Sequence, residues 1–176
     1  MFDMDPSSAV AAHLPDTGQV KCYDNTKEIP GPGPTAPFYG QDAQYQGAQL
    51  SYRGNGDGTV SDLNTGLMWQ QGDAQNDWGY GWSDALIYCD TLALAGHTDW
   101  RLPSRRELLS LVDYAKFNPA IDTQYFPGCL YDNKYWSSTV TANSPNNAWE
   151  VYFSYGATYA DSKVYAQYVR CVRDEL

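Results

Sequence analysis

The sequence predicts an α+β protein in which the helices lie centrally along the chain and the strands lie toward both ends. Three observations lead to this expectation. Gly, Pro, Asn, Asp and Ser interrupt the chain at short intervals, which is typical of many short elements joined by loops. Helical periodicity is confined to two segments between residues 83 and 115, and strand-like runs flank them on both sides.

Residues 1–50 are predicted to be a loop-like extension rich in Pro and Gly, and residues 51–176 a folded domain. The run from Pro30 to Pro34 alternates Pro with Gly. Pro lacks an amide donor and Gly resists ordering, so neither a helix nor a central strand forms there. From Ser51 onward the sequence has the pattern of short, regular secondary-structure elements.

The first element expected in the domain is a β-hairpin. A turn at residues 55–58 precedes short alternating segments around Val60 and around Leu67–Trp69. Asn55, Asp57 and Thr59 have the spacing of a calcium loop, but the later glutamate ligand is missing, so a plain turn is expected and no metal site is assigned.

Two helices are expected next. Ser83 is the candidate N-cap of the first, which ends before Gly96. The second opens with a capping box formed by Ser104 and Glu107, and its periodicity extends to Ala115. The apolar positions that define the two helices are Leu86, Ile87, Leu92 and Leu94 in the first and Leu108, Leu109, Leu111 and Val112 in the second.

Three strand-like runs follow, at 135–138, 149–153 and 168–172. In the second run, Trp149, Val151 and Phe153 alternate and are expected on one face of a sheet.

Charge excludes several classes of function. The 176-residue chain has a formal net charge of −10, with 21 acidic and 11 basic side chains. Such a surface does not neutralise a nucleic-acid backbone, and an acidic membrane leaflet repels it. Apolar runs are too short to span a bilayer, so no membrane insertion is expected, and no charged-then-apolar leader is recognisable.

The four cysteines, Cys22, Cys89, Cys129 and Cys171, are widely spaced and contain no C-x-x-C pair. This spacing argues against zinc, iron–sulfur and thioredoxin-like sites. An even number in an acidic, Tyr-rich chain favours two disulfides and an oxidising compartment. Four unpaired core thiols in a cytosolic protein remain the alternative.

Six motifs in order give the chain a family resemblance. The region from about residue 51 to residue 176 resembles the Lcl-C-like family, the domain at the C-terminus of a bacterial collagen-like adhesin. The motifs are Asn55–Val60, Thr65–Trp69, Asp99–Pro103, Asn118–Asp122, Tyr135–Ser138 and Tyr168–Arg173.

The resemblance implies a C-type-lectin-like fold, with two helices, short antiparallel sheets and paired terminal strands. It also implies a disulfide between Cys89 and Cys171, which leaves Cys22 and Cys129 to pair and to pin the extension to the domain. The calcium-binding sugar motifs of true C-type lectins are absent, and an enzyme is not expected. His97, Asp99 and Glu107 are the only tempting catalytic cluster.

Residues 152–166 resemble the diversified segment of variable proteins of diversity-generating retroelements, several of which use this domain. Adenine mutagenesis of Asn codons of the form AAC cannot produce Gln, Glu, Lys, Met or Trp, and none of these stands at the twelve candidate positions. The candidates for ligand binding are Tyr152, Ser154, Tyr155, Ala157, Thr158, Tyr159, Ala160, Asp161, Ser162, Val164, Tyr165 and Ala166. An ordinary Tyr-rich surface hairpin explains the same residues equally well.

The function expected from these observations is a non-catalytic, extracellular or cell-surface binding module without a cofactor, which presents a variable Tyr-rich face to an unknown protein or glycan on a cell surface. The alternative is a constant adhesin module that binds glycans or a protein receptor. The net charge of −10 argues against polyanionic glycans in either case.

Overall fold

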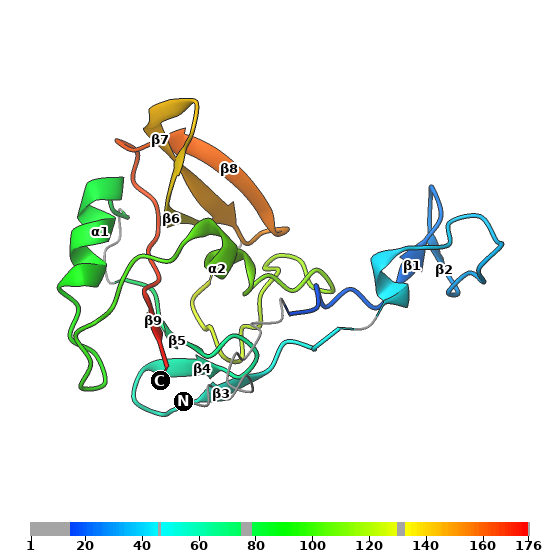
Figure 1. The fold of residues 1–176 in the computed structure, drawn as a ribbon, viewed down its shortest axis with the longest axis horizontal. Coiled ribbons are helices and arrows are strands. Elements are labelled where there is room, and N and C mark those ends of the chain that lie inside the picture. The colour runs from blue at the N-terminus through cyan, green and yellow to red at the C-terminus, as the bar shows by residue number, and fades with distance from the viewer. Residues whose placement is uncertain (1–14, 46, 75–78, 130–132, 176) are drawn as a thin grey trace, which may run out of the picture.

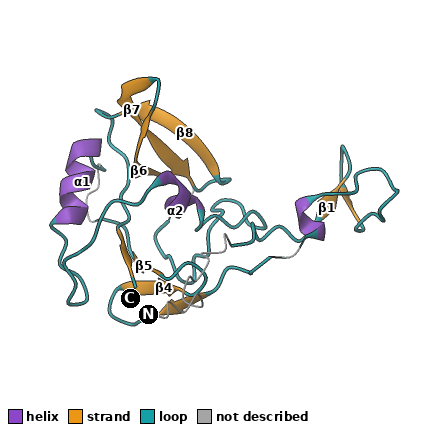
Figure 2. Ribbon diagram, in the orientation of Figure 1, coloured by secondary structure: helices purple, strands orange, loops and turns teal. Residues whose placement is uncertain are grey.

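The computed structural model describes residues 15–45, 47–74, 79–129 and 133–175. Within these residues the chain forms two α-helices, one short 3₁₀ helix and three antiparallel sheets (Figures 1 and 2). The elements are β1 (Cys22–Tyr23), β2 (Glu28–Ile29), η1 (Asp42–Gln44), β3 (Tyr52–Gly54), β4 (Thr59–Asp62), β5 (Leu67–Gln70), α1 (Trp82–Asp90), α2 (Arg105–Leu109), β6 (Lys134–Thr141), β7 (Ser144–Tyr152), β8 (Ala157–Ser162) and β9 (Val172–Asp174). The predicted α+β class and the short antiparallel sheets are confirmed.

The predicted extension contains more regular structure than expected. β1 pairs with β2, and these strands and η1 form a small lobe that projects from the rest of the molecule (Figure 1). Residues 1–14 and 46 of the extension lie outside the described residues. Pro30–Pro34 contains no helix or strand, as its composition predicts.

The predicted hairpin is present as β4 and β5, and β3 precedes it. Residues 55–58 form the turn between β3 and β4, where Asp57 Oδ1 accepts a 2.6 Å hydrogen bond from Thr59 Oγ1. Gly56 and Gly58 have φ angles of 78° and 89°, values that glycine adopts without strain. The turn is therefore closed by its own side-chain and backbone hydrogen bonds.

β9 completes this sheet in the order β3-β4-β5-β9. The expectation that the terminal strands pair with each other is wrong, because β9 pairs with β5 and β3 lies at the opposite edge. An ion pair of 3.0 Å between Arg53 and Glu175 still connects β3 with the end of the chain.

α1 begins one residue before the predicted cap. Its N-cap is Gly81, and the amide of Trp82 donates to the carbonyl of Lys163 at 3.0 Å. A distant loop thus satisfies the first amide of the helix, and Ser83 lies inside the first turn instead of at the cap. Ala85 and Cys89 form the buried stripe of the helix, whereas Ile87 is exposed.

α2 is capped as predicted but is shorter than predicted. The amide of Glu107 donates to Ser104 Oγ at 3.3 Å, and Glu107 Oε2 accepts from the Ser104 amide at 2.7 Å. The helix ends at Leu109, and Ser110 Oγ donates to the carbonyl of Glu107. The chain then turns, and the amide of Asp113 donates to the carbonyl of Ala120.

The sheet β6-β7-β8 separates two hydrophobic clusters. Tyr135 and Val151 are opposite each other and belong to the first cluster, while the neighbouring Trp136 belongs to the second. The first cluster also contains residues of α2 and of β4, β5 and β9, and the second contains residues of α1. Both faces of the sheet are therefore partly buried.

Cys89 and Cys171 form the expected disulfide, which joins α1 to the chain just before β9. Closure of a loop with 82 residues of separation stabilises the fold by about 4 kcal/mol in the chain-entropy model.

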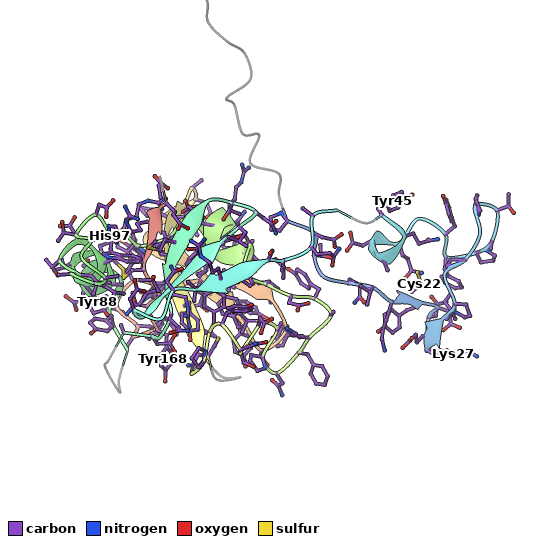
Figure 3. The ribbon with its side chains drawn as sticks, turned by 90° about the horizontal axis from the view of Figure 1, so that it is seen from below. Cys22, Lys27, Tyr45, Tyr88, His97 and Tyr168 are labelled. Carbon is purple, nitrogen blue, oxygen red and sulfur yellow. A yellow bond between two sulfur atoms is a disulfide. The ribbon has the colours of Figure 1, made fainter. Side chains whose placement is uncertain are left out.

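The second expected disulfide is absent. Cys22 and Cys129 are both free and buried, so they do not pin the extension to the domain. Cys22 lies in the projecting lobe (Figure 3), whereas Cys129 packs inside the first hydrophobic cluster. Desolvation in that cluster raises the pKa of Cys129 to about 11, which keeps it a protonated thiol.

Candidate ligand-binding surface

The hairpin of β7 and β8 carries most of the predicted site. β8 pairs with β7 alone and forms an edge of its sheet. Directly opposite residues of an antiparallel pair share a face. The register pairs Tyr159 with Glu150 and Ala157 with Tyr152, so these four side chains point to the same side of the sheet.

Three tyrosines gather at one end of this face. The rings of Tyr152 and Tyr155 pack edge to face at 5.1 Å, and those of Tyr152 and Tyr159 lie 6.5 Å apart. The hydroxyls of Tyr155 and Tyr159 are 2.8 Å apart and hydrogen-bonded. Tyr155 and Tyr159 are 53% and 42% exposed, and Tyr152 is half-buried. We call Tyr152, Tyr155 and Tyr159 the tyrosine surface.

The turn that carries Tyr155 is held in place by Val112 and Tyr114, which contact Gly156. Gly156 has a φ of 75°, and a side chain there would meet Val112 Cγ1 at 2.5 Å. Tyr114 donates its hydroxyl proton to the carbonyl of Gly156 at 3.0 Å. Only glycine fits this close approach, and the approach fixes the position from which Tyr155 projects.

A charged pair lies beneath the tyrosine surface. Glu150 is fully buried, and its Oε1 lies 2.9 Å from Lys134 Nζ. The Lys134 ammonium also lies 5.5 Å from the ring centroid of Tyr159. Desolvation raises the pKa of Glu150, and the nearby Lys134 opposes that shift.

The twelve predicted residues do not form one face. Strand alternation turns Thr158, Ala160 and Ser162 away from the tyrosine surface, while Asp161 points to the same side as Tyr159. Val164, Tyr165 and Ala166 lie in the exposed turn after β8, whose Lys163 carbonyl accepts from α1.

Ser154 is a structural residue in this arrangement. It is 9% exposed, and its Oγ donates to Asn118 Oδ1 at 2.6 Å. The amide of Asn118 also donates to the carbonyl of Ser154 at 2.7 Å. These bonds attach the β7–β8 turn to the loop at Asn118–Pro119.

Sequence reasoning missed both Lys134 and Glu150. The alternation of Trp149, Val151 and Phe153 was the available signal, because it turns Glu150 and Tyr152 to the other face together. No sequence pattern identifies Lys134, whose pairing depends on the register of β6 with β7.

Asp99 and Glu107, the acidic residues of the candidate catalytic cluster, each form an ion pair with an arginine. Asp99 pairs with Arg173 at 2.8 Å, and Glu107 accepts two hydrogen bonds from Arg101 at 2.7 and 2.9 Å. The hydrogen bond from Arg173 lowers the pKa of Asp99. His97 pairs with Leu94 through backbone hydrogen bonds in a tight turn.

Another buried pair supports the core. Arg170 is fully buried and donates to Asp73 at 2.6 Å, and Tyr135 donates to the other oxygen of Asp73 at 2.8 Å. Within the described ranges no cluster of His, Cys, Asp and Glu is arranged to hold a metal ion, and no helix is long and apolar enough to cross a membrane.

A family model described as the Lcl C-terminal domain matches residues 58–173 of this chain. The match covers most of the chain, and the protein therefore belongs to the Lcl C-terminal domain family. No curated protein matches it. The matched region includes both helices, the disulfide and the whole β7–β8 hairpin, and it excludes the projecting lobe.

Proposed function

We propose that this chain is a non-catalytic, adhesin-like binding module of the cell surface, and that the tyrosine surface contacts its ligand. The observation that carries the proposal is the exposure of Tyr155 and Tyr159 on an edge hairpin whose turn is fixed at Gly156. Exposed tyrosines that are already ordered supply contact area at low entropic cost. A C-type-lectin-like scaffold is the fold that we propose for the domain.

The non-catalytic part of the proposal has separate support. Asp99 and Glu107, the acidic side chains nearest to a catalytic arrangement, are committed to arginine partners. A general acid or base needs a titratable group that is free to reach a substrate.

We further propose that the exposed positions of residues 152–166 are diversified by a retroelement. The exposed candidates are Tyr155, Tyr159, Ala160, Val164, Tyr165 and Ala166, so changes there alter the surface and leave the core intact. Sequencing this gene in many copies from its native population tests this step. Adenine-derived substitutions confined to these codons are expected, and a uniform sequence would contradict diversification.

One observation favours a constant adhesin module as the second candidate. Ser154 is buried and hydrogen-bonded to Asn118, so free variation at that position would disturb the turn. A constant surface that binds a glycan or a protein receptor carries no such conflict.

Binding itself is tested with the Tyr155→Ala/Tyr159→Ala double variant. The fluorescently labelled, tetramerised protein is applied to a glycan array and to intact cells read by flow cytometry. We expect wild-type binding to fall at least tenfold in the double variant, because its exposed aromatic anchors are lost. Its melting temperature should stay within a few degrees of wild type, since both side chains are exposed and neither belongs to a hydrophobic cluster.

Tyr45→Ala is the matched control, because Tyr45 is 60% exposed and lies in the projecting lobe (Figure 3). It should bind as wild type does. Equal binding by the double variant and wild type would show that the ligand contacts another surface.

A further inference from the structure

One carboxylate beneath the tyrosine surface is only partly satisfied. Glu150 has no solvent-exposed surface, and its Oε1 is near the ammonium of Lys134. Neither Oε1 nor Oε2 has a hydrogen-bond partner among the described residues, and the contact of Oε1 with Lys134 is an ion pair. A buried carboxylate usually has its lone pairs matched by donors, so these oxygens retain the capacity to accept a further donor.

The groups around Glu150 are those that bind cations. The ring of Tyr159 faces the Lys134 ammonium at 5.5 Å, within the range of a cation–π interaction. Tyr152 packs against Tyr155 and Tyr159 and extends the aromatic wall. Asp161, on the same side, is close enough to raise the pKa values of both Lys134 and Glu150.

Lys134 of this chain therefore makes the same contacts that a cationic group of a ligand would make. Its ammonium lies between a carboxylate and an aromatic ring, and its side chain is 35% exposed. A side chain at that level of exposure can leave the pair by rotation about its own stem. Lys163, the next lysine along the hairpin, donates instead to the carbonyl of Pro145 and lies over the ring of Trp82.

We infer that the tyrosine surface binds a lysine or arginine side chain on a basic segment of a partner protein, which displaces Lys134 from Glu150 and Tyr159. Glu150 and Asp161 supply the negative charge, and the ring of Tyr159 supplies the aromatic face. The net charge of −10 favours the approach of such a partner over an acidic one. This inference rests on the proposed function, because it names the ligand class of the same surface.

The test uses the full chain and a fluorescent peptide of alternating Lys and Gly, with its fully acetylated counterpart as reference. We expect the acetylated peptide to bind at least tenfold more weakly in fluorescence anisotropy. Diffuse attraction by a chain of charge −10 also gives that result, so matched charge variants are needed to locate the contact.

Glu150→Gln is compared with Glu28→Gln, which removes the same charge from the projecting lobe, where Glu28 pairs with the exposed Lys21. We expect about a tenfold loss of affinity for Glu150→Gln and less than a twofold loss for Glu28→Gln. Equal losses would assign the binding to net charge and overturn the inference.

Lys134→Met is compared with Lys163→Met, which makes the same change of charge nearby. Removal of the competing cation should tighten peptide binding at least threefold in Lys134→Met, and Lys163→Met should exceed wild type by less than twofold. Weaker binding by Lys134→Met would mean that this lysine only supports the surface, and would overturn the inference.

Each variant is first checked by thermal unfolding. If Glu150→Gln does not fold, Asp161→Asn takes its place with an expected loss of about threefold, and the lysine pair is unaffected. Failure of the inference is distinguishable from failure of the proposed function. A glycan or cell ligand that depends on Tyr155 and Tyr159, together with no preference for the lysine peptide, overturns only the inference.

Discussion

Single buried side chains in this protein connect segments that are far apart in sequence. Arg170 donates to the carbonyl of Gln70 at 2.9 Å and to Asp73, and its guanidinium lies 4.9 Å from the ring centroid of Phe126. Trp136 acts similarly, because its indole Nε1 donates to the carbonyl of Tyr80 at 2.9 Å. Removal of Arg170 takes away packing and the cation that pairs with Asp73, whereas removal of Trp136 takes away packing alone, because the carbonyl of Tyr80 still accepts the amide of Gln167.

Trp136→Ala should lower the free energy of unfolding by about 3–5 kcal/mol, the range for deletion of a large buried side chain. Trp136 has no exposed surface and packs in the cluster with Ala148 and Val169. Urea denaturation followed by far-UV circular dichroism measures the loss. Tyr165→Ala, an exposed aromatic truncation, is the control and should change stability by less than about 1 kcal/mol. A loss below 1 kcal/mol for Trp136→Ala would mean that the side chain is not packed as described.

The burial of Glu150 leads to a prediction about how the free energy of unfolding depends on pH. Desolvation raises the pKa of this carboxyl in the folded state above its ordinary value of 4.5. The folded chain therefore binds more protons than the unfolded chain, so this group's contribution to stability falls as pH rises from about 4.5 through the raised pKa. Glu150→Gln lacks this loss. The difference in unfolding free energy, variant minus wild type, should increase between pH 4 and pH 7 in urea titrations. A difference that decreases over this range would show that Lys134 outweighs desolvation.

At the scale of elements, local signals predicted what depends on neighbouring residues. The capping box at Ser104 and Glu107 is confirmed because both partners lie within one turn of helix. The start of α1 could not be predicted in this way, since the amide of its first residue, Trp82, donates to the carbonyl of Lys163, 81 residues later in the chain. The candidate site follows the same rule: exposed tyrosines were found from sequence, whereas the buried Lys134–Glu150 pair depends on sheet register.

The disulfide joins α1 to the chain just before β9, and the number of free thiols can be counted directly. The resemblance implied two disulfides, and the structure contains Cys89–Cys171 with Cys22 and Cys129 free. Alkylation of the unfolded, non-reduced chain should label two thiols, and peptide mapping should assign them to Cys22 and Cys129. After reduction, four thiols should be labelled. If no thiol is labelled before reduction and a Cys22–Cys129 linked peptide is found, the structure is contradicted.

At the scale of the whole molecule, two adjacent segments join the lobe to the rest of the chain. We call them the arms: the first contains Asp16 and Thr17, and the second contains Ala48 and Leu50. The amide of Asp16 donates to the carbonyl of Ala48 at 2.8 Å, and the amide of Tyr114 donates to the carbonyl of Thr17 at 2.8 Å. The first arm therefore contacts the loop that follows α2, and Leu50 of the second packs against the first hydrophobic cluster. Neither cluster contains a residue of β1, β2 or η1. Figures 1 and 3 show the lobe extending beyond this junction.

This arrangement predicts that the lobe contributes little to the stability of the domain. Replacement of residues 21–45 by a short Gly-Ser linker keeps both arms and should change the free energy of unfolding by less than about 1 kcal/mol, because no core contact is removed. Removal of residues 1–50 should cost more, since it also deletes the Thr17–Tyr114 hydrogen bond and Leu50, which packs against the first cluster. Guanidinium denaturation of the three chains measures both changes. Equal destabilisation by the two deletions would mean that the lobe itself supports the domain, and the boundary predicted near residue 50 would then be wrong.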